Sequence, residues 1–188
     1  MTSTSPRLRP DRPIEGVDLD AIRNRIRDIA DFPQPGILFR DITPLLAEGP
    51  LFHQLIDALQ RHYQGRIDAV VAIESRGFIF GAPLAYALGV GIVPVRKAGK
   101  LPFATHSAAY ALEYGEATLE IHVDAIGPGQ RILLVDDLLA TGGTVRAAAD
   151  LIEGLGAEIA GVFVLAELSA LGGRDRLGAY DVRSLIQY

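Results

Sequence analysis

Apolar residues recur along the chain at two spacings, which separate expected helices from expected strands. A first set has the three- and four-residue spacing of one helix face: Leu19, Ile22, Ile26 and Ile29. With Asp18 as a candidate N-cap, this set predicts a helix that ends before Phe32. The proline-punctuated segment DFPQPGILFRD then predicts a loop that leads into a short extended piece.

Three further segments are expected to be helical. Leu51, Leu55 and Leu59 share one face of a helix that opens at Gly49-Pro50. A helix rich in small residues is expected over residues 81–88. A third helix is expected over residues 144–155, where Gly156 is a suitable stop signal.

Short apolar runs between these helices predict buried strands. They are AVVAI at 69–73, GIVPVRK at 91–97, RILLVD at 131–136 and GVFVLAEL at 161–168. Alternating polar and apolar positions over residues 108–123, interrupted by Gly115-Glu116, predict a β-hairpin. Strands that alternate with helices indicate an α/β fold, with a mostly parallel twisted sheet flanked by helices. The strands are too few for a (β/α)₈ barrel.

Composition narrows the class of protein. The chain has 188 residues, of which 49% are hydrophobic and 22% charged, as expected for one globular domain at 18–188 after a mobile tail at 1–17. The absence of cysteine excludes disulfides and thiolate nucleophiles. A net charge of -5 argues against a nucleic-acid partner. No apolar run approaches the ~20 residues of a membrane span, and the polar N-terminus lacks a signal peptide, so we expect a cytoplasmic protein.

The segment RILLVDDLLATGGTVRAA combines two kinds of chemistry. Its glycines and threonines stand between a strand and a helix, where backbone N–H groups and hydroxyls can bind a phosphate. Its two adjacent carboxylates repel phosphate but accept hydrogen bonds from vicinal hydroxyls. Together they favour a ribose 5-phosphate ligand over a bare capped turn. An ATP-binding P-loop, and hence a kinase, is disfavoured because the lysine of GxxxxGK[ST] is absent.

Several segments resemble those of a known family. LLVDD followed by LLATGGT is similar to the signature with which type I phosphoribosyltransferases bind phosphoribosyl pyrophosphate (PRPP). From about residue 20 onward the similarity is to the adenine phosphoribosyltransferases. The segments concerned are DFPQPGILFRDITPLL, ESRGFIFG, RKAGKLP, YALEYGEATLEI, AELSALGGRDRL and SLIQY. The resemblance implies the type I phosphoribosyltransferase fold, with a β-hairpin lid and an N-terminal base-binding segment.

The resemblance assigns the PRPP-binding residues. The 5-phosphate is expected on Ala140, Thr141, Gly142, Gly143 and Thr144. Asp136 and Asp137 are expected to bind the ribose hydroxyls. Pyrophosphate is expected on a loop with a cis peptide bond at Glu74–Ser75 and on a basic cluster; these residues are Glu74, Ser75, Arg76, Arg96, Lys97 and Lys100. Mg²⁺ is expected to bind mainly through PRPP and pyrophosphate, with no protein side chain assigned as a metal ligand.

The resemblance also assigns the base-binding and lid residues. Leu38 and Phe39 are expected to form one wall of an adenine slot, Arg40 to contribute backbone groups at its edge, and Leu168 to form the opposite wall. Glu113 and Tyr114 are expected on the lid, with Glu113 exchanging a proton with adenine. Arg76 is the second expected catalytic residue, because it stabilises the leaving group.

The activity implied is purine salvage, in which a homodimer converts adenine and PRPP into AMP and pyrophosphate. The nearest alternative is a transferase of the same fold that acts on xanthine, hypoxanthine or orotate. A regulatory protein that keeps the PRPP site only as a sensor is a second alternative. The segment before Leu19 is too short and polar for the DNA-binding module that such a regulator needs.

Overall fold

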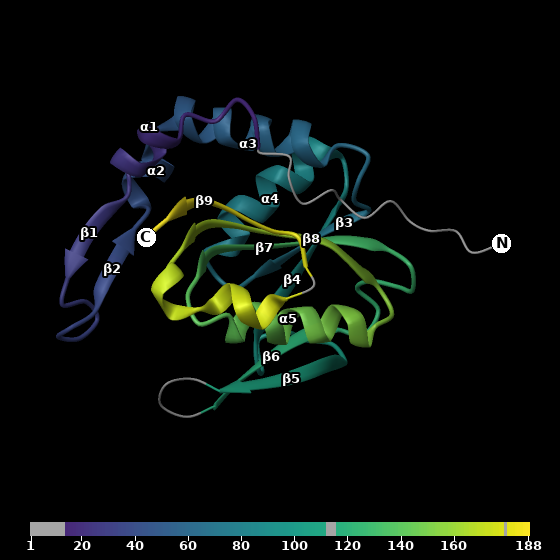
Figure 1. The fold of residues 1–188 in the computed structure, drawn as a ribbon. Coiled ribbons are helices and arrows are strands. Elements are labelled where there is room, and N and C mark those ends of the chain that lie inside the picture. The colour runs from purple at the N-terminus through teal and green to yellow at the C-terminus, as the bar shows by residue number, and fades with distance from the viewer. Residues whose placement is uncertain (1–13, 112–115, 179) are drawn as a thin grey trace. The chain divides into compact units, whose positions relative to one another are not determined.

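A computed structural model describes residues 14–111, 116–178 and 180–188 (Figure 1). They form two compact units. One unit comprises Tyr63–Tyr188, and the other comprises the described residues before it, up to His62.

The described residues of the larger unit form a seven-stranded sheet in the order β5-β6-β4-β3-β7-β8-β9. Its strands are β3 (Ala69–Ile73), β4 (Gly91–Lys97), β5 (Thr105–Ala111), β6 (Glu116–His122), β7 (Arg131–Leu139), β8 (Glu158–Glu167) and β9 (Val182–Gln187). β4, β3, β7, β8 and β9 run parallel, whereas β5 and β6 form an antiparallel hairpin joined to β4. The predicted mostly parallel sheet and the predicted hairpin are therefore confirmed, although Glu116, expected between the two strands, lies in β6 opposite Ala111. The strand β9 was not predicted.

Two helices cover opposite faces of this sheet (Figure 1). α4 (Gly77–Leu88) packs on β3, β4 and β7, and α5 (Gly143–Gly154) packs on β7, β8 and the hairpin. Two short 3₁₀ helices follow β8, η1 (Ser169–Leu171) and η2 (Gly173–Leu177). The predicted helices at 81–88 and 144–155 are confirmed, although α4 begins four residues earlier than expected.

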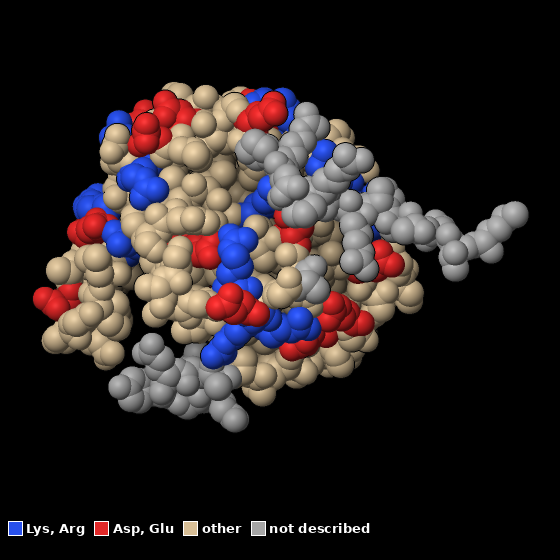
Figure 2. Space-filling view, viewed as in Figure 1, with Lys and Arg blue, Asp and Glu red and all other residues tan. Residues whose placement is uncertain are grey.

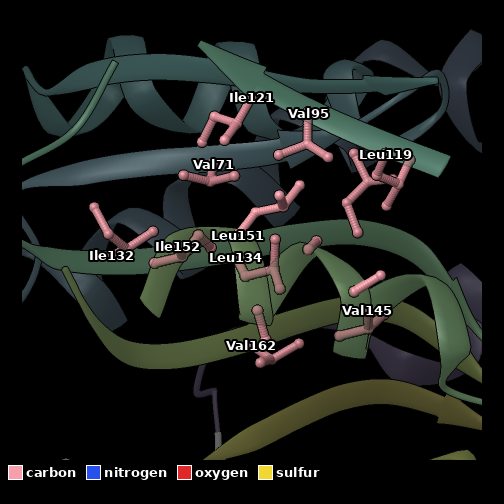
Figure 3. Packing of buried hydrophobic residues seen from close by; sticks show 14 of the residues in the cluster. Val71, Val95, Leu119, Ile121, Ile132, Leu134, Val145, Leu151, Ile152 and Val162 are labelled. Atoms are coloured by element: carbon pink, nitrogen blue, oxygen red, sulfur yellow. The ribbon is translucent and has the colours of Figure 1, made fainter. Parts of the chain in front are cut away.

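The core lies between the central strands and α5 (Figure 3). Val71, Leu134 and Val162 come from three neighbouring strands and are fully buried, as are Leu151 and Ile152 of α5. Burial of each such side chain stabilises the fold by about 1.5–3 kcal/mol. The buried core therefore holds in place the strands whose carboxyl ends carry the loops of the site.

The smaller unit contains α1 (Leu19–Asn24), β1 (Arg27–Ala30), β2 (Leu38–Asp41), α2 (Thr43–Ala47) and most of α3 (Gly49–Tyr63). The helix predicted at 51–59 is confirmed as part of α3. The Asp18 side chain caps α1 by accepting a hydrogen bond from the N–H of Ala21 at 2.9 Å, as expected. The expected extent of that first helix was wrong, because α1 ends at Asn24. Ile29 instead lies in β1, opposite Phe39 of β2. Its helical spacing from Ile26 was overridden by pairing with a strand that lies ten residues further along.

Charged side chains on the surface are mixed in sign. Figure 2 shows acidic and basic residues lying side by side on the face in view, so charge there is balanced locally rather than gathered by sign. In the part of the chain that the structure describes, no helix is long and apolar enough to cross a membrane.

Candidate active site

The candidate site lies at the carboxyl end of β7, beyond the point where β7 stops pairing with β3. β7 pairs with β3 as far as Val135 but continues to pair with β8 as far as Leu139. The last four residues of β7 are therefore open on the β3 side. Asp136 and Asp137 lie at the start of this open stretch. The expectation that the strand ends at the aspartates was wrong, since β8 holds it in register for two more residues.

The loop after β7 turns sharply into α5. Gly142 is the N-cap of α5 and has a φ of 80°, a left-handed conformation that glycine adopts without steric cost. A Cβ at this position would lie 2.5 Å from the carbonyl oxygen of Gly173, so a larger residue has no room. The first N–H groups of a helix have no partner within it, and the first turn of α5 carries no acidic side chain. Residues 140–144 thus form a backbone cradle suited to an anion.

The two aspartates contact each other and an arginine. The N–H of Asp137 donates to Oδ1 of Asp136 at 2.9 Å, and Nε of Arg76 lies 3.0 Å from Oδ2 of Asp137. Burial, and then the charge of Asp137, raises the pKa of Asp136 well above its usual value. Burial also raises the pKa of Asp137, although Arg76 opposes this effect. Both carboxylates are therefore under-solvated in the free protein, and hydroxyl donors or a cation at this point would stabilise them.

Residues 74–76 connect β3 to α4 beside the aspartates. The Glu74–Ser75 peptide bond is cis, as the resemblance implied. Gly77 then packs against β7, where a Cβ would lie 2.7 Å from the carbonyl oxygen of Val135. This close approach brings Arg76 within reach of Asp137. Ser75 is exposed at the carboxyl edge of the sheet.

The basic cluster is organised around Glu74. Nε of Arg96 lies 2.9 Å from a carboxylate oxygen of Glu74, which also accepts a 3.3 Å hydrogen bond from the N–H of Lys97. Arg96 donates in addition to the carbonyl oxygen of Lys100 at 3.0 Å. The structure thus brings all three expected basic residues together. The Arg96 side chain lies between Glu74 and the loop that contains Lys100. The side chains of Lys97 and Lys100 are exposed.

The expected adenine-binding residues lie in different units. Leu38, Phe39 and Arg40 are in β2 of the smaller unit, where Leu38 is 47% exposed and the Phe39 ring packs edge-on against Phe32. The Arg40 side chain pairs with Asp28, which lies opposite it on β1. Leu168, in the larger unit, is half-buried directly after β8. The expected lid residues Glu113 and Tyr114 lie outside the described residues.

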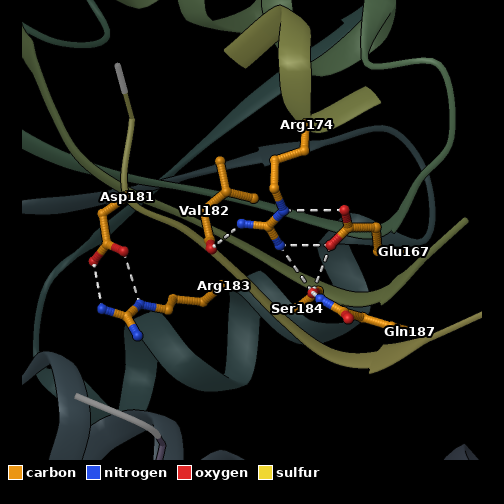
Figure 4. A network of polar contacts seen from close by, with 7 residues as sticks. All are labelled: Glu167, Arg174, Asp181, Val182, Arg183, Ser184 and Gln187. Carbon is orange, nitrogen blue, oxygen red and sulfur yellow. Dashed lines mark hydrogen bonds and ion pairs between the residues drawn. The ribbon is translucent and has the colours of Figure 1, made fainter. Parts of the chain in front are cut away.

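The residues that follow Leu168 were not assigned to the site, although the resemblance included them. Gly173 of this segment lies against the loop at 140–144, and Arg174 binds the buried Glu167 (Figure 4). The sequence offered one signal, the string GGRDR, because paired glycines often mark a close approach of two backbones.

A strand-to-helix phosphate cradle beside paired carboxylates defines a phosphoribosyltransferase, and residues 46–188 match the family model of the phosphoribosyl transferase domain. Adenine phosphoribosyltransferase of Acidothermus cellulolyticus is 59% identical over 169 residues, which are 89% of this chain and 96% of the relative. The chain belongs to the adenine phosphoribosyltransferase family, as its motifs implied.

Solved structures agree with this assignment. The crystal structure of adenine phosphoribosyltransferase from Thermoanaerobacter pseudethanolicus is 53% identical with a TM-score of 0.87, covering 90% of this chain and 99% of its own. The enzyme from Saccharomyces cerevisiae is 43% identical with a TM-score of 0.85, covering 89% and 97%. That enzyme was solved in complex with D-2,5-dideoxy-2,5-imino-altritol 1,6-bisphosphate and adenine. The predicted type I phosphoribosyltransferase fold is confirmed.

Proposed function

We propose that this protein transfers the 5-phosphoribosyl group of PRPP to adenine, giving AMP and pyrophosphate in purine salvage. The observation that carries the proposal is the anion cradle at 140–144, which stands directly beside the under-solvated carboxylates of Asp136 and Asp137. A phosphate and a diol on one sugar complement these two features. Adenine is the expected base because relatives that are more than 50% identical to this chain are named adenine phosphoribosyltransferase.

In the proposed reaction the bond from C1 of the ribose to the pyrophosphate oxygen breaks as a ring nitrogen of adenine attacks the opposite face. Pyrophosphate leaves with the bonding electron pair, and the attacking nitrogen loses its proton. Negative charge grows on the leaving group, where Arg76, Lys97 and Lys100 can stabilise it. No protein nucleophile is required. Exclusion of water by the lid matters, because water would hydrolyse the activated sugar.

Magnesium fits the donors that this site offers. Among the described residues, no three His, Cys, Asp or Glu side chains gather into a metal-binding group. Mg²⁺ is commonly held by one or two carboxylates together with substrate phosphates. Asp136 and Asp137 are suited to this arrangement, with the pyrophosphate and ribose hydroxyl oxygens of PRPP supplying the other ligands. Bound Mg²⁺ would neutralise charge that develops on the pyrophosphate.

The base-binding and lid roles are proposed from the resemblance. Leu38, Phe39 and Leu168 supply apolar contacts to adenine, and backbone groups of Arg40 bind its edge. Glu113 exchanges the proton of the attacking nitrogen, beneath a lid that includes Tyr114. We propose further that the enzyme is a cytoplasmic homodimer, as the family resemblance implies.

The test is nucleotide formation from separate bases. The protein is incubated with Mg²⁺, PRPP and one of adenine, hypoxanthine, guanine or xanthine, and products are resolved by chromatography. We expect AMP from adenine, and strong loss of AMP formation in Asp137→Asn without loss of folded structure. Reaction with hypoxanthine or guanine but not adenine would show that the base is wrong. PRPP binding without nucleotide formation from any base would instead indicate a sensor.

A further inference from the structure

Glu167 is a buried acidic residue outside the residues assigned to substrate. It is 4% exposed at the end of β8, and its carboxylate forms a two-point pair with Arg174, at 3.0 Å from Nε and 2.5 Å from Nη2 (Figure 4). The Ser184 hydroxyl of β9 donates to the same carboxylate at 2.7 Å. Hydrogen bonds from Arg174, and then from Ser184, lower the pKa of Glu167, so the pair is ionised at neutral pH.

Arg174 is held by more than its counter-ion. Its Nη1 donates to the carbonyl oxygen of Val182 at 2.8 Å, and its Nη2 lies 3.1 Å from the Ser184 hydroxyl. The guanidinium therefore joins the first turn of η2 to the last residue of β8 and to the first half of β9. A planar, bidentate group of this kind fixes orientation as well as distance.

Gly173, the residue before Arg174, packs against the backbone of residues 140–142. A Cβ on Gly173 would stand 2.1 Å from the carbonyl oxygen of Ala140 and 2.9 Å from the backbone nitrogen of Gly142. The two backbones are thus in contact, with no side chain between them. A shift of Gly173 toward the loop would displace residues 140–142, and a shift away from it would remove a contact that supports them.

Leu168 is positioned independently of Arg174. Its N–H donates to the carbonyl oxygen of Leu139 at 2.8 Å, which continues the β7–β8 pairing past the end of β8. Loss of the Arg174 pair should therefore disturb the phosphate loop while Leu168 stays in place.

We propose that Arg174, anchored on Glu167 and Ser184, is a positioning residue that holds Gly173 against residues 140–142 and so fixes the 5-phosphate cradle. The inference rests on the proposed function, because it presumes that this cradle binds the 5-phosphate of PRPP and AMP. Arg174 itself does not need to contact substrate.

The experiment compares two ligands that differ only in the 5-phosphate. AMP and adenosine affinities are measured by calorimetry for the wild type, Arg174→Lys and Ser184→Ala, well below each midpoint of thermal unfolding. Arg174→Lys keeps the charge but loses the two-point geometry, and Ser184→Ala is a milder change should the first variant fail to fold. Arg176→Lys is the matched control, because Arg176 is an exposed arginine of the same 3₁₀ helix. Gly173→Ala shows the effect of displacing the cradle directly.

We expect AMP affinity to fall by about tenfold to a hundredfold in Arg174→Lys and Gly173→Ala, since the loss of one hydrogen bond to a charged phosphate has an effect of this size. A smaller loss is expected in Ser184→Ala. Adenosine affinity should be unchanged throughout, and Arg176→Lys should match the wild type. A general loosening of the fold would weaken both ligands alike.

Two results would overturn the inference. One is wild-type AMP affinity in folded Arg174→Lys and Ser184→Ala, and the other is an equal loss for AMP and adenosine. A wild-type protein that makes no AMP from adenine and PRPP would overturn the proposed function instead.

Discussion

Gly77 sets the distance between the pyrophosphate loop and the strand that carries the aspartates, so Gly77→Ala tests how precisely the two must be held. A Cβ there would lie 2.7 Å from the carbonyl oxygen of Val135 and 3.2 Å from both Cα and Oδ1 of Asp136. Ordinary contact begins at 3.4 Å, so the start of α4 must move by about 0.7 Å. The obstacle is mainly backbone and cannot rotate away.

Overpacking and helix propensity have opposite effects on the free energy of unfolding of Gly77→Ala. Overpacking of this kind destabilises a protein by about 1–3 kcal/mol. The gain in helix propensity from glycine to alanine offsets at most about 1 kcal/mol, and less at the first helical residue. We therefore expect a net loss of about 1–2 kcal/mol, which corresponds to a fall in Tm of roughly 2–8 °C for a chain of this length. Because Arg76 moves with the helix start, kcat/KM should fall by about tenfold to a hundredfold.

The assay pairs thermal unfolding with the rate of AMP formation. Gly91→Ala is the matched control, since Gly91 begins β4 without a positive φ, and an added methyl group there would meet no atom within 4 Å. It should leave both quantities unchanged. If Gly77→Ala behaved like Gly91→Ala in both measurements, the reasoning about backbone contact would be refuted.

Three other variants test the charges of the site. Asp136→Asn should raise Tm at neutral pH, because protonated Asp136 contributes stability that is complete below pH 3.8 and is lost as the pH rises through its elevated pKa. Melting curves across pH check this, and an advantage over the wild type that did not shrink toward pH 3.8 would contradict it. Arg96→Lys should weaken inhibition by pyrophosphate about tenfold, because one cation replaces a guanidinium that bridges two loops; unchanged inhibition would count against that role. Glu113→Gln should lower kcat by about 10²–10⁴ without changing Tm, and a loss under about tenfold would exclude Glu113 as the proton-transfer group.

The sequence patterns predicted those elements that are determined by residues close together in the chain. The strand β7, the loop at 140–144 and α5 follow one another in sequence, so apolar runs, glycines and helical spacing were enough to predict them, apart from the last residues of β7. The extent of α1 could not be predicted in the same way. Residues 26–29 suit a helix by spacing, and only pairing with β2 makes Arg27–Ala30 a strand.

Contacts between residues that are far apart in the sequence could not be predicted from these patterns. The resemblance assigned Arg96 to pyrophosphate, but its pairing with Glu74 joins residues 22 positions apart and was not predicted. Glu167, which pairs with Arg174, also accepts a hydrogen bond from Ser184 of β9, 17 positions further along the chain. A single sequence shows that such residues are charged, but it does not show which partners they meet.

The backbone contacts of Gly77 and Gly173 hold the loops of the site more firmly than the ion pairs of Arg76 and Arg96 do. The Arg76–Asp137 and Arg96–Glu74 pairs each include an arginine about one-third exposed, so solvent screens both pairs. The contacts of Gly77 with Val135 and of Gly173 with residues 140–142 involve backbone atoms that have nowhere to move. These contacts fix the pyrophosphate loop and the phosphate cradle on either side of the end of β7. The charged side chains are then free to exchange an internal partner for a ligand while the loops that carry them keep their positions.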